Sequence, residues 1–454
     1  MSWFARLGPT AHYIIIAVAA TALVVIAALL WLALGPGPMD FALRNPVALA
    51  DYNGANPTDV PPQFARESLV RRGEYLATAA DCAACHTAKG GAPFAGGFPF
   101  VLPYGTLYSA NITRDKDTGI GNWSDAAFLN AIHKGIDDEG VPLYPAMPYA
   151  SYSGMTDADA LAIKAYLFSL KPVHNDVPEN TLRFPFNQRW LMSVWSMLFN
   201  PDKRFRPDAS RSAQWNRGAY LAENLAHCGD CHTPRNLLQA LNNRSKFAGA
   251  AQAGWLAYNI TSDKTSGIGA WSAAEIAQYL SIGHVEGHGT ASGPMGEAVD
   301  KSLGHLVPDD IAAIVAYVQT VPAVASPDLP ALKSSPAPAS HKQGVIANFD
   351  PRGKAIYEGA CASCHDWTGV SPLMRFATFT GARAVNDPSA TNVAQIVITG
   401  MVRQAPGGKT SMPAFGSSLS DSEIAAVANY VTARFGAKPS SVTVQEVAKL
   451  RHAV

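Results

Sequence analysis

The spacing of apolar residues along the chain predicts a mainly α-helical protein with one long apolar segment near its start. From Tyr13 to Leu34, 22 consecutive positions carry no charged residue. Three later segments place apolar residues at helical intervals: Ala160, Ile163 and Leu167; Ile311, Ile314 and Val318; and Ile424, Val427 and Val431. Strand-like patterning is confined to short pieces such as Phe98 to Leu102 and Val393 to Ile398.

The first apolar run is long enough to cross a bilayer as a helix, so we expect residues 1–38 to form an uncleaved transmembrane anchor. Tyr13 and Trp31 lie near its ends, as interfacial aromatic residues do. A cleaved signal peptide is the alternative, but its apolar region is usually shorter. Arg6 favours a cytoplasmic N-terminus. We therefore expect a single-pass protein of the bacterial inner membrane, with the rest of the chain on the periplasmic side.

Helix-start patterns accompany the three later segments. Thr156 with Asp159 and Ser420 with Glu423 have the spacing of capping boxes, and Pro308 suits the first turn of a helix. Each predicted helix carries one tyrosine on its apolar face: Tyr166, Tyr317 or Tyr430. We expect these tyrosines to lie in the core, where they pack the last helix of a segment on its first.

The length of the chain indicates how many domains it has, and its charge bears on the kind of partner it binds. The 454 residues suffice for about three domains, at ~150 residues each. Lys plus Arg and Asp plus Glu both number 35, so the net charge is near zero. The chain has no excess of basic residues that would indicate a nucleic-acid partner.

The six cysteines occur only in Cys-x-x-Cys-His motifs: Cys82, Cys85 and His86; Cys228, Cys231 and His232; and Cys361, Cys364 and His365. Two thiols one helical turn apart can form thioethers with the two vinyl groups on one edge of a haem, and the next residue then lies beneath the iron. The motifs predict three covalently bound haem c groups, with the cysteines as attachment sites and the histidines as proximal ligands. Disulfides, zinc and a thioredoxin-like redox pair are the competing interpretations. Zinc would combine two clusters, whereas each motif here has its own domain-sized segment.

A methionine thioether is the usual second axial ligand of a high-potential haem, and each segment offers one next to a proline. The candidates are Met147, Met295 and Met412. We expect each to bind the iron from a fixed loop. Among these three, only Met295 lacks a following proline. Its rivals are His284, His288 and His305, and weaker rivals elsewhere are Met155 and Met401.

The first two haem segments form an internal duplication. Asn111-Ile112-Thr113, Gly119-Ile120-Gly121 and Trp123-Ser124 recur, each displaced by 148 positions, as Asn259-Ile260-Thr261, Gly267-Ile268-Gly269 and Trp271-Ser272. The displacement from Met147 to Met295 is the same, which supports Met295 as a ligand.

Two stretches connect the segments. Phe184 to Phe199 is rich in aromatic residues, and it either packs against neighbouring domains or rests on a membrane surface or a partner subunit. Val321 to Ser340 is rich in proline, alanine and serine, which is typical of a semi-rigid linker.

Each haem segment resembles class I cytochrome c, with Cys-x-x-Cys-His near a first helix, a loop methionine, and a terminal helix with an aromatic residue. The resemblance covers most of Glu67 to Phe435. It implies three such domains in tandem behind one N-terminal transmembrane helix. We expect an anchor at 1–38, cytochrome c domains at 67–180, 210–322 and 346–438, a connector at 181–209, a linker at 323–345 and a tail at 439–454.

As a whole, the chain resembles the three-haem cytochrome subunit of the membrane-bound alcohol, aldehyde, gluconate or sorbitol dehydrogenases of acetic acid bacteria. The Asn-Ile-Thr…Gly-Ile-Gly-x-Trp-Ser block is specific to that group. The resemblance implies an electron-transfer subunit with no substrate site of its own, which takes electrons from a large dehydrogenase subunit and passes them through three haems to membrane ubiquinone. It also allows a small subunit as a further partner.

The implied large subunit is either a molybdopterin aldehyde dehydrogenase or a quinoprotein alcohol dehydrogenase. The expected uncleaved N-terminal span slightly favours the aldehyde dehydrogenase. Two other classes stay open: a membrane-tethered carrier without a dehydrogenase partner, and a catalytic multihaem peroxidase. A peroxidase needs an open sixth position on one iron, and the stretch from Gly283 to His288 is where we expect it. A distal methionine opposes that function because it closes the site.

Overall fold

The chain is mainly helical, as predicted. The computed structural model describes residues 9–200, 202–338, 350–405 and 408–453, and in the first helix the side chains of residues 10 and 12–25. The strands in these ranges form four two-stranded antiparallel hairpins. They pair β1 (Pro99–Leu102) with β2 (Gly105–Tyr108), β3 (Ala250–Gln252) with β4 (Trp255–Ala257), β5 (His284–Val285) with β6 (Gly289–Thr290), and β7 (Met401–Ala405) with β8 (Gly408–Met412).

The helices follow the order of the three cysteine motifs along the chain. The first segment contains α2 (Leu69–Ala79), α3 (Cys82–His86), α4 (Asp125–Lys134), α5 (Tyr149–Tyr152) and α6 (Asp157–Ser169). The second contains α8 (Ala213–Tyr220), α9 (Gly229–His232), α10 (Ala273–Ile282), α11 (Gly293–Lys301) and α12 (Pro308–Val318). The third contains α13 (Pro351–Ile356), α14 (Ala362–His365), α15 (Thr391–Thr399), α16 (Asp421–Phe435) and α17 (Val444–His452).

One helix crossing occurs in all three segments: α2 packs on α6, α8 on α12, and α13 on α16. A glycine makes each close approach possible. A Cβ atom at Gly73, Gly218 or Gly353 would lie 1.8, 1.8 or 2.2 Å from the carbonyl oxygen of the facing Ala162, Ala313 or Ala426. The tyrosines predicted as core residues lie at these crossings. Tyr317 and Tyr430 are buried and Tyr166 is partly buried, so their packing role is confirmed.

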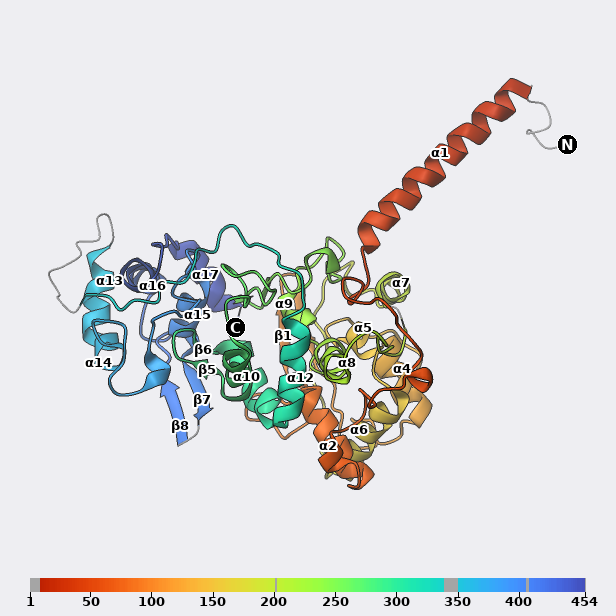
Figure 1. The fold of residues 1–454 in the computed structure, drawn as a ribbon, viewed down its shortest axis with the longest axis horizontal. Coiled ribbons are helices and arrows are strands. Elements are labelled where there is room, and N and C mark those ends of the chain that lie inside the picture. Colours follow the sequence, from red (N-terminus) through yellow and green to blue (C-terminus); the bar gives the residue numbers. More distant parts are fainter. Residues whose placement is uncertain (1–8, 201, 339–349, 406–407, 454) are drawn as a thin grey trace.

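The first two segments share one hydrophobic core, whereas the third has its own. Figure 1 shows the two parts, with α13 to α17 lying beside the body formed by the first two segments. The shared core contains Leu76, Ile163, Leu221 and Ile314, which are each at most 2% exposed.

Reciprocal hydrogen bonds join the first two segments. Tyr75 of the first donates to Asp310 of the second at 2.7 Å, and Tyr220 of the second donates to Asp159 of the first. Within the second segment, Arg217 adds bonds to the same carboxylate of Asp310 at 2.8 and 2.7 Å. All four carboxyl and phenol groups belong to buried residues. The predicted capping box at Thr156 is therefore wrong in one half: Thr156 accepts from the amide of Asp159, but the carboxylate of Asp159 accepts from Tyr220.

Two local predictions have opposite outcomes. The strand predicted at Phe98 to Leu102 is present as β1. The strand predicted at Val393 to Ile398 is wrong, because these residues belong to α15. Val393, Ala394, Val397 and Ile398 are buried in the third core. Their burial follows the helical period, and tertiary packing has overridden the strand preference of β-branched residues.

The predicted membrane anchor is also wrong. Helix α1 (Pro9–Leu34) covers the long apolar run and projects away from the other helices (Figure 1). Within the part of the chain that the structure describes, however, no helix is long and apolar enough to cross a membrane. Residues 1–8 of the predicted anchor lie outside the described residues. The localisation inferred from that anchor was a single-pass inner-membrane protein with periplasmic haem domains. It is not supported, because the spanning helix on which it depended is not found among the residues that the structure describes.

The two connecting stretches differ in how closely they pack. The aromatic connector forms α7 (Trp190–Phe199), of which no residue is fully buried, and Trp190 and Met197 are 63% and 76% exposed. Trp195 donates from its indole nitrogen to the carbonyl of Leu238 at 2.8 Å. The described part of the predicted linker runs along neighbouring segments, where Val324 accepts a bond from Asn259. Its remainder, residues 339–345, lies outside the described residues.

Candidate haem sites

Each cysteine motif forms a single helical turn directly after a longer helix. In the first segment the motif is α3, and Asp81 before it has a left-handed backbone, with φ of 52°. In the second and third segments a short π-helix leads into the motif, over Leu221–Leu225 and Tyr357–Cys361. A π-helical turn shifts the direction of following side chains, and such turns are frequent at functional sites. Two thiols and one imidazole are thus carried on one turn in all three segments.

Each of the three motif histidines has a backbone carbonyl as the partner of its Nδ1 atom. The Nδ1 atoms of His86, His232 and His365 lie 2.7, 2.6 and 2.6 Å from the carbonyl oxygens of Ala110, Tyr258 and Ala377. A carbonyl only accepts, so Nδ1 carries the proton and Nε2 keeps its lone pair. Burial lowers the pKa of each imidazole, which favours the neutral form. A neutral ring held through one nitrogen is what an axial iron ligand requires.

These carbonyl acceptors were not found from the sequence, although a clue was present. Ala110 and Tyr258 directly precede the repeated Asn-Ile-Thr block. Within that block, Asn111 donates to the carbonyl of Val173 at 2.8 Å, and Asn259 donates to that of Val324 at 2.6 Å. The block therefore ties the loop that carries the acceptor to the chain beyond the last helix of its segment.

The cysteines do not fit two of the competing interpretations, disulfides and a thioredoxin-like redox pair. All six are free of disulfide bonds. Burial raises the pKa of Cys82, Cys85 and Cys228 to about 12 and that of Cys231 and Cys361 to about 11. A redox-active pair needs a lowered thiol pKa. Protonated thiols on the same turn as a neutral imidazole fit the donor set of a covalently attached haem.

The three candidate methionines are partly buried on the same cores as their motifs. Met147 and Met295 pack on the shared core with Cys82 and Cys228. Met412 packs on the third core with Cys361. Only Met147 lies in a loop, just before α5. Met295 lies in the first turn of α11 and Met412 ends β8, so the loop setting predicted for all three holds for one.

The rivals of these methionines have other contacts. Each of the three rival histidines has one ring nitrogen near a neighbouring group: His284 near the Thr290 hydroxyl at 2.9 Å, His288 near Glu275 at 3.3 Å, and His305 near the Asp300 carbonyl at 2.9 Å. Met155 is 1% exposed and belongs to the shared core. Met401 pairs with Met412 across the β7–β8 hairpin. The assignment of Met147, Met295 and Met412 stays a prediction.

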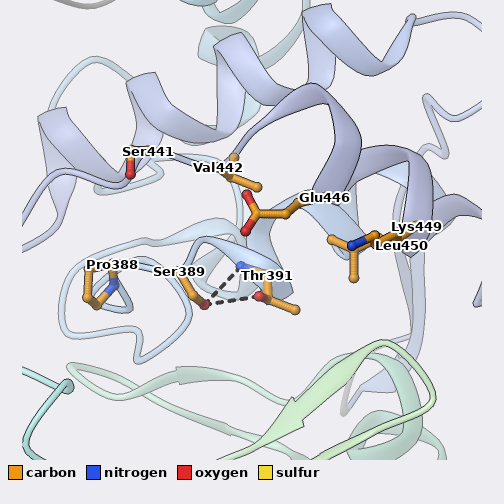
Figure 2. A pocket seen from close by; sticks show the side chains of 8 residues that line it. All are labelled: Pro388, Ser389, Thr391, Ser441, Val442, Glu446, Lys449 and Leu450. Carbon is orange, nitrogen blue, oxygen red and sulfur yellow. Dashed lines mark hydrogen bonds between the residues drawn. The ribbon is translucent and has the colours of Figure 1, made fainter.

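One surface hollow lies away from the motifs, between α15 and α17 (Figure 2). It measures about 250 Å³, and its lining includes Ser389, Thr391 and Glu446. Ser389 donates to the hydroxyl of Thr391 at 3.0 Å, and Glu446 caps α17 through Thr443. These polar groups are bonded locally, and their arrangement does not indicate a reaction centre.

Comparison with known proteins finds family models over the first and third motifs. The cytochrome c family model matches residues 70–171, and the model for subunit III of cbb3-type cytochrome c oxidase matches residues 349–431. The chain is 39% identical to the fructose dehydrogenase cytochrome subunit of Gluconobacter japonicus, over 90% of this chain and 88% of that one.

Two further relatives are subunits of the same kind. The gluconate 2-dehydrogenase cytochrome c subunit of Pantoea cypripedii is 39% identical, over 85% of this chain and 90% of its own length. The cytochrome c subunit of the alcohol dehydrogenase (quinone) of Gluconobacter oxydans is 34% identical, over 86% of this chain and 83% of its own length.

Proposed function

Because the chain belongs to the family of cytochrome c subunits of fructose, gluconate and alcohol dehydrogenases, we propose that it carries electrons from a dehydrogenase subunit through three haem c groups to ubiquinone. The observation that carries this proposal is the threefold repetition of one donor set: two thiols and a neutral imidazole whose Nδ1 is bonded to a backbone carbonyl. Bound haem iron supplies one-electron chemistry, and the protein sets its potential through axial ligands, burial and hydrogen bonds.

The proposed sites follow the motifs. The haems are attached through Cys82 and Cys85, Cys228 and Cys231, and Cys361 and Cys364. The axial pairs are His86 with Met147, His232 with Met295, and His365 with Met412. The three groups belong to cytochrome c domains at 67–180, 210–322 and 346–438. The three similar helix crossings support this division, and the shared core implies that the first two domains act as one rigid unit.

The partner we propose oxidises a hydroxyl-bearing compound such as an alcohol or a sugar derivative. The names of the three relatives refer to fructose, gluconate and alcohol, and one of them also names a quinone. The slight preference for a molybdopterin aldehyde dehydrogenase rested on an N-terminal membrane span, and it falls with that prediction.

The test is to purify the full chain in mild detergent from cells that express it, identify co-eluting subunits, and count haem c by the pyridine haemochrome method. We expect three haems per chain, a co-eluting dehydrogenase, and reduction of a ubiquinone analogue when an alcohol or sugar is added. Replacing both cysteines of one motif by alanine should remove one haem. Ser363→Ala, between the cysteines of the third motif, is the matched control and should retain all three.

Other results would contradict the proposal in identifiable ways. A chain with three haems that elutes alone and is reduced by none of these substrates would contradict the dehydrogenase partnership. Fewer than three haems in the unaltered chain would contradict the attachment sites.

A further inference from the structure

An arginine from the third segment is inserted beside the candidate methionine of the second. Arg403 lies on β7 and is 1% exposed. Its Nη1 donates to the carbonyl of Gly296 at 2.6 Å, and its Nη2 donates to the carbonyl of Ile282 at 3.3 Å. Asp300 provides the counter-charge at 3.1 Å. Gly296 directly follows Met295, so the guanidinium is bonded to the carbonyl of the residue after the candidate ligand.

The second segment is shaped to admit this side chain. A Cβ atom at Gly283 would lie 2.2 Å from Nη2 of Arg403, and one at Gly296 would lie 2.9 Å from Nη1. A hollow of about 260 Å³ at the same junction is lined by α11 and β7, including Glu297 and Lys301. Two glycines therefore leave room where ordinary side chains would exclude the guanidinium.

In the duplicated first segment, other groups lie at the positions equivalent to Gly296 and Gly283. Its residue equivalent to Gly296 is Pro148, and its residue equivalent to Gly283 is Gly135, each 148 positions earlier. A Cβ atom at Gly135 would lie 2.5 Å from the ring of Tyr149, so an aromatic ring of the first segment itself fills that position. Proline fixes its own backbone φ, and this restrains the peptide after Met147. The second segment has neither the proline nor the ring at these places.

We propose that Arg403 is a positioning residue for Met295: the third segment supplies the restraint on the second candidate ligand that Pro148 and Tyr149 supply on the first. The buried fork of donors fixes the Gly296 carbonyl, and thereby the direction of the preceding methionine. Correct ligation in the second domain then depends on contact with the third. This inference rests on the proposed ligation of the second haem by Met295.

Arg403 can be changed without separating the two segments, because other bonds join them. Asn392 exchanges two hydrogen bonds with the backbone of Leu256, at 2.8 and 2.9 Å. Tyr258 donates to Asp387 at 3.0 Å. Variants at 403 therefore test the guanidinium and leave the rest of the junction in place.

The experiment uses the full chain with its haems and compares Arg403→Met, Arg403→Lys and Lys409→Gln. Lys409 is an exposed cation on the same hairpin and is the matched control. Two readouts are followed: the weak red absorption band of methionine-ligated ferric haem, and carbon monoxide binding by the reduced protein. Arg403→Met should lose the band of one haem and gain one carbon monoxide site per chain. Arg403→Lys keeps the charge but lacks the planar fork, so it should also gain a site but bind carbon monoxide more slowly than Arg403→Met.

The outcomes separate this inference from the function it rests on. If the unaltered protein shows fewer than three methionine-ligated haems, the proposed ligation fails. If it shows three and both Arg403 variants match it, only the role of Arg403 is refuted. A new carbon monoxide site in Lys409→Gln as well would assign the effect to the hairpin surface and also refute the role of Arg403. If Arg403→Met does not incorporate haem, Arg403→Lys is compared with Lys409→Gln instead. A new carbon monoxide site in Arg403→Lys alone supports the role of Arg403, and no new site in Arg403→Lys refutes it.

Discussion

Asp310→Asn is the most informative change at the junction of the first two segments. Asp310 is 3% exposed and accepts three hydrogen bonds, one from Tyr75 at 2.7 Å and two from Arg217 at 2.8 and 2.7 Å. The asparagine keeps the shape but removes the charge, so the guanidinium of Arg217, whose side chain is 12% exposed, loses its counter-ion. Removing one partner of a buried ion pair costs about 3–5 kcal/mol.

The cost should appear as a lower urea midpoint in equilibrium unfolding followed by circular dichroism. With an m value of about 3 kcal/mol/M, a loss of about 3 kcal/mol lowers the midpoint by about 1 M. Glu358→Gln is the control, because it removes one charge of the exposed Lys354–Glu358 pair, and we expect it to cost less than about 0.5 kcal/mol.

The combined change Arg217→Met and Asp310→Leu should recover most of the lost stability, because no buried charge is then left without a partner. A fall of less than about 1 kcal/mol in Asp310→Asn would refute the argument that Arg217 depends on this carboxylate as its buried counter-ion. A double variant no more stable than Asp310→Asn would show that the cost comes from misfit and not from the isolated charge.

Three further predictions concern stability and ligation. Burial opposes ionisation of Asp208, but hydrogen bonds from Arg44, Asn45 and Ser210 lower its pKa to about 2 from 3.8. The ionised carboxylate therefore contributes about 2 kcal/mol to the free energy of unfolding above pH 3.8, and this contribution is lost as the pH falls through 2. Asp208→Asn should remove this acid-dependent loss from unfolding curves measured between about pH 4 and 2, and an unchanged pH profile would contradict the assignment. Gly218→Ala should cost about 3 kcal/mol or more in urea unfolding, since its Cβ would lie 1.8 Å from the Ala313 carbonyl, whereas Gly359→Ala, with nothing within 4 Å, should cost almost nothing. Met155→Leu should keep the red absorption band of every methionine-ligated haem and cost less than about 1.5 kcal/mol, and loss of one band would instead identify Met155 as a ligand.

Local patterns were sufficient for the parts of the site that are contiguous in sequence. The Cys-x-x-Cys-His motifs, the capping box at Ser420 and the strand at Phe98 to Leu102 depend on residues within a few positions of one another. The duplication was readable because the Asn-Ile-Thr block recurs at one displacement, and its hydrogen bonds match in both copies.

The predictions that were wrong or missing depend on packing between distant residues. Val393 to Ile398 has strand-forming residues, yet its burial in the third core makes it a helix. Asp159 has the spacing of a capping residue, but the phenol of Tyr220 reaches it from the other segment. Arg403 lies 107 positions from the Gly296 carbonyl it bonds, and no local pattern connects the two. Length and apolar composition suggested a membrane span that the described part of the chain does not contain.

The exchanged tyrosine bonds also have a consequence for the origin of the chain. Tyr75 and Tyr220 each lie two residues after the glycine of their helix crossing, and each reaches the carboxylate at the start of the other segment's last helix. Mutual contacts of this kind define an isologous interface between identical subunits. The pair therefore has the architecture of a fused homodimer, in which a single ancestral unit would have met its own copy through the same tyrosine and aspartate. The two halves differ at the neighbouring arginine: Arg217 pairs with Asp310 of its own segment, whereas its counterpart Arg72 pairs with Asp59, which precedes the first repeat.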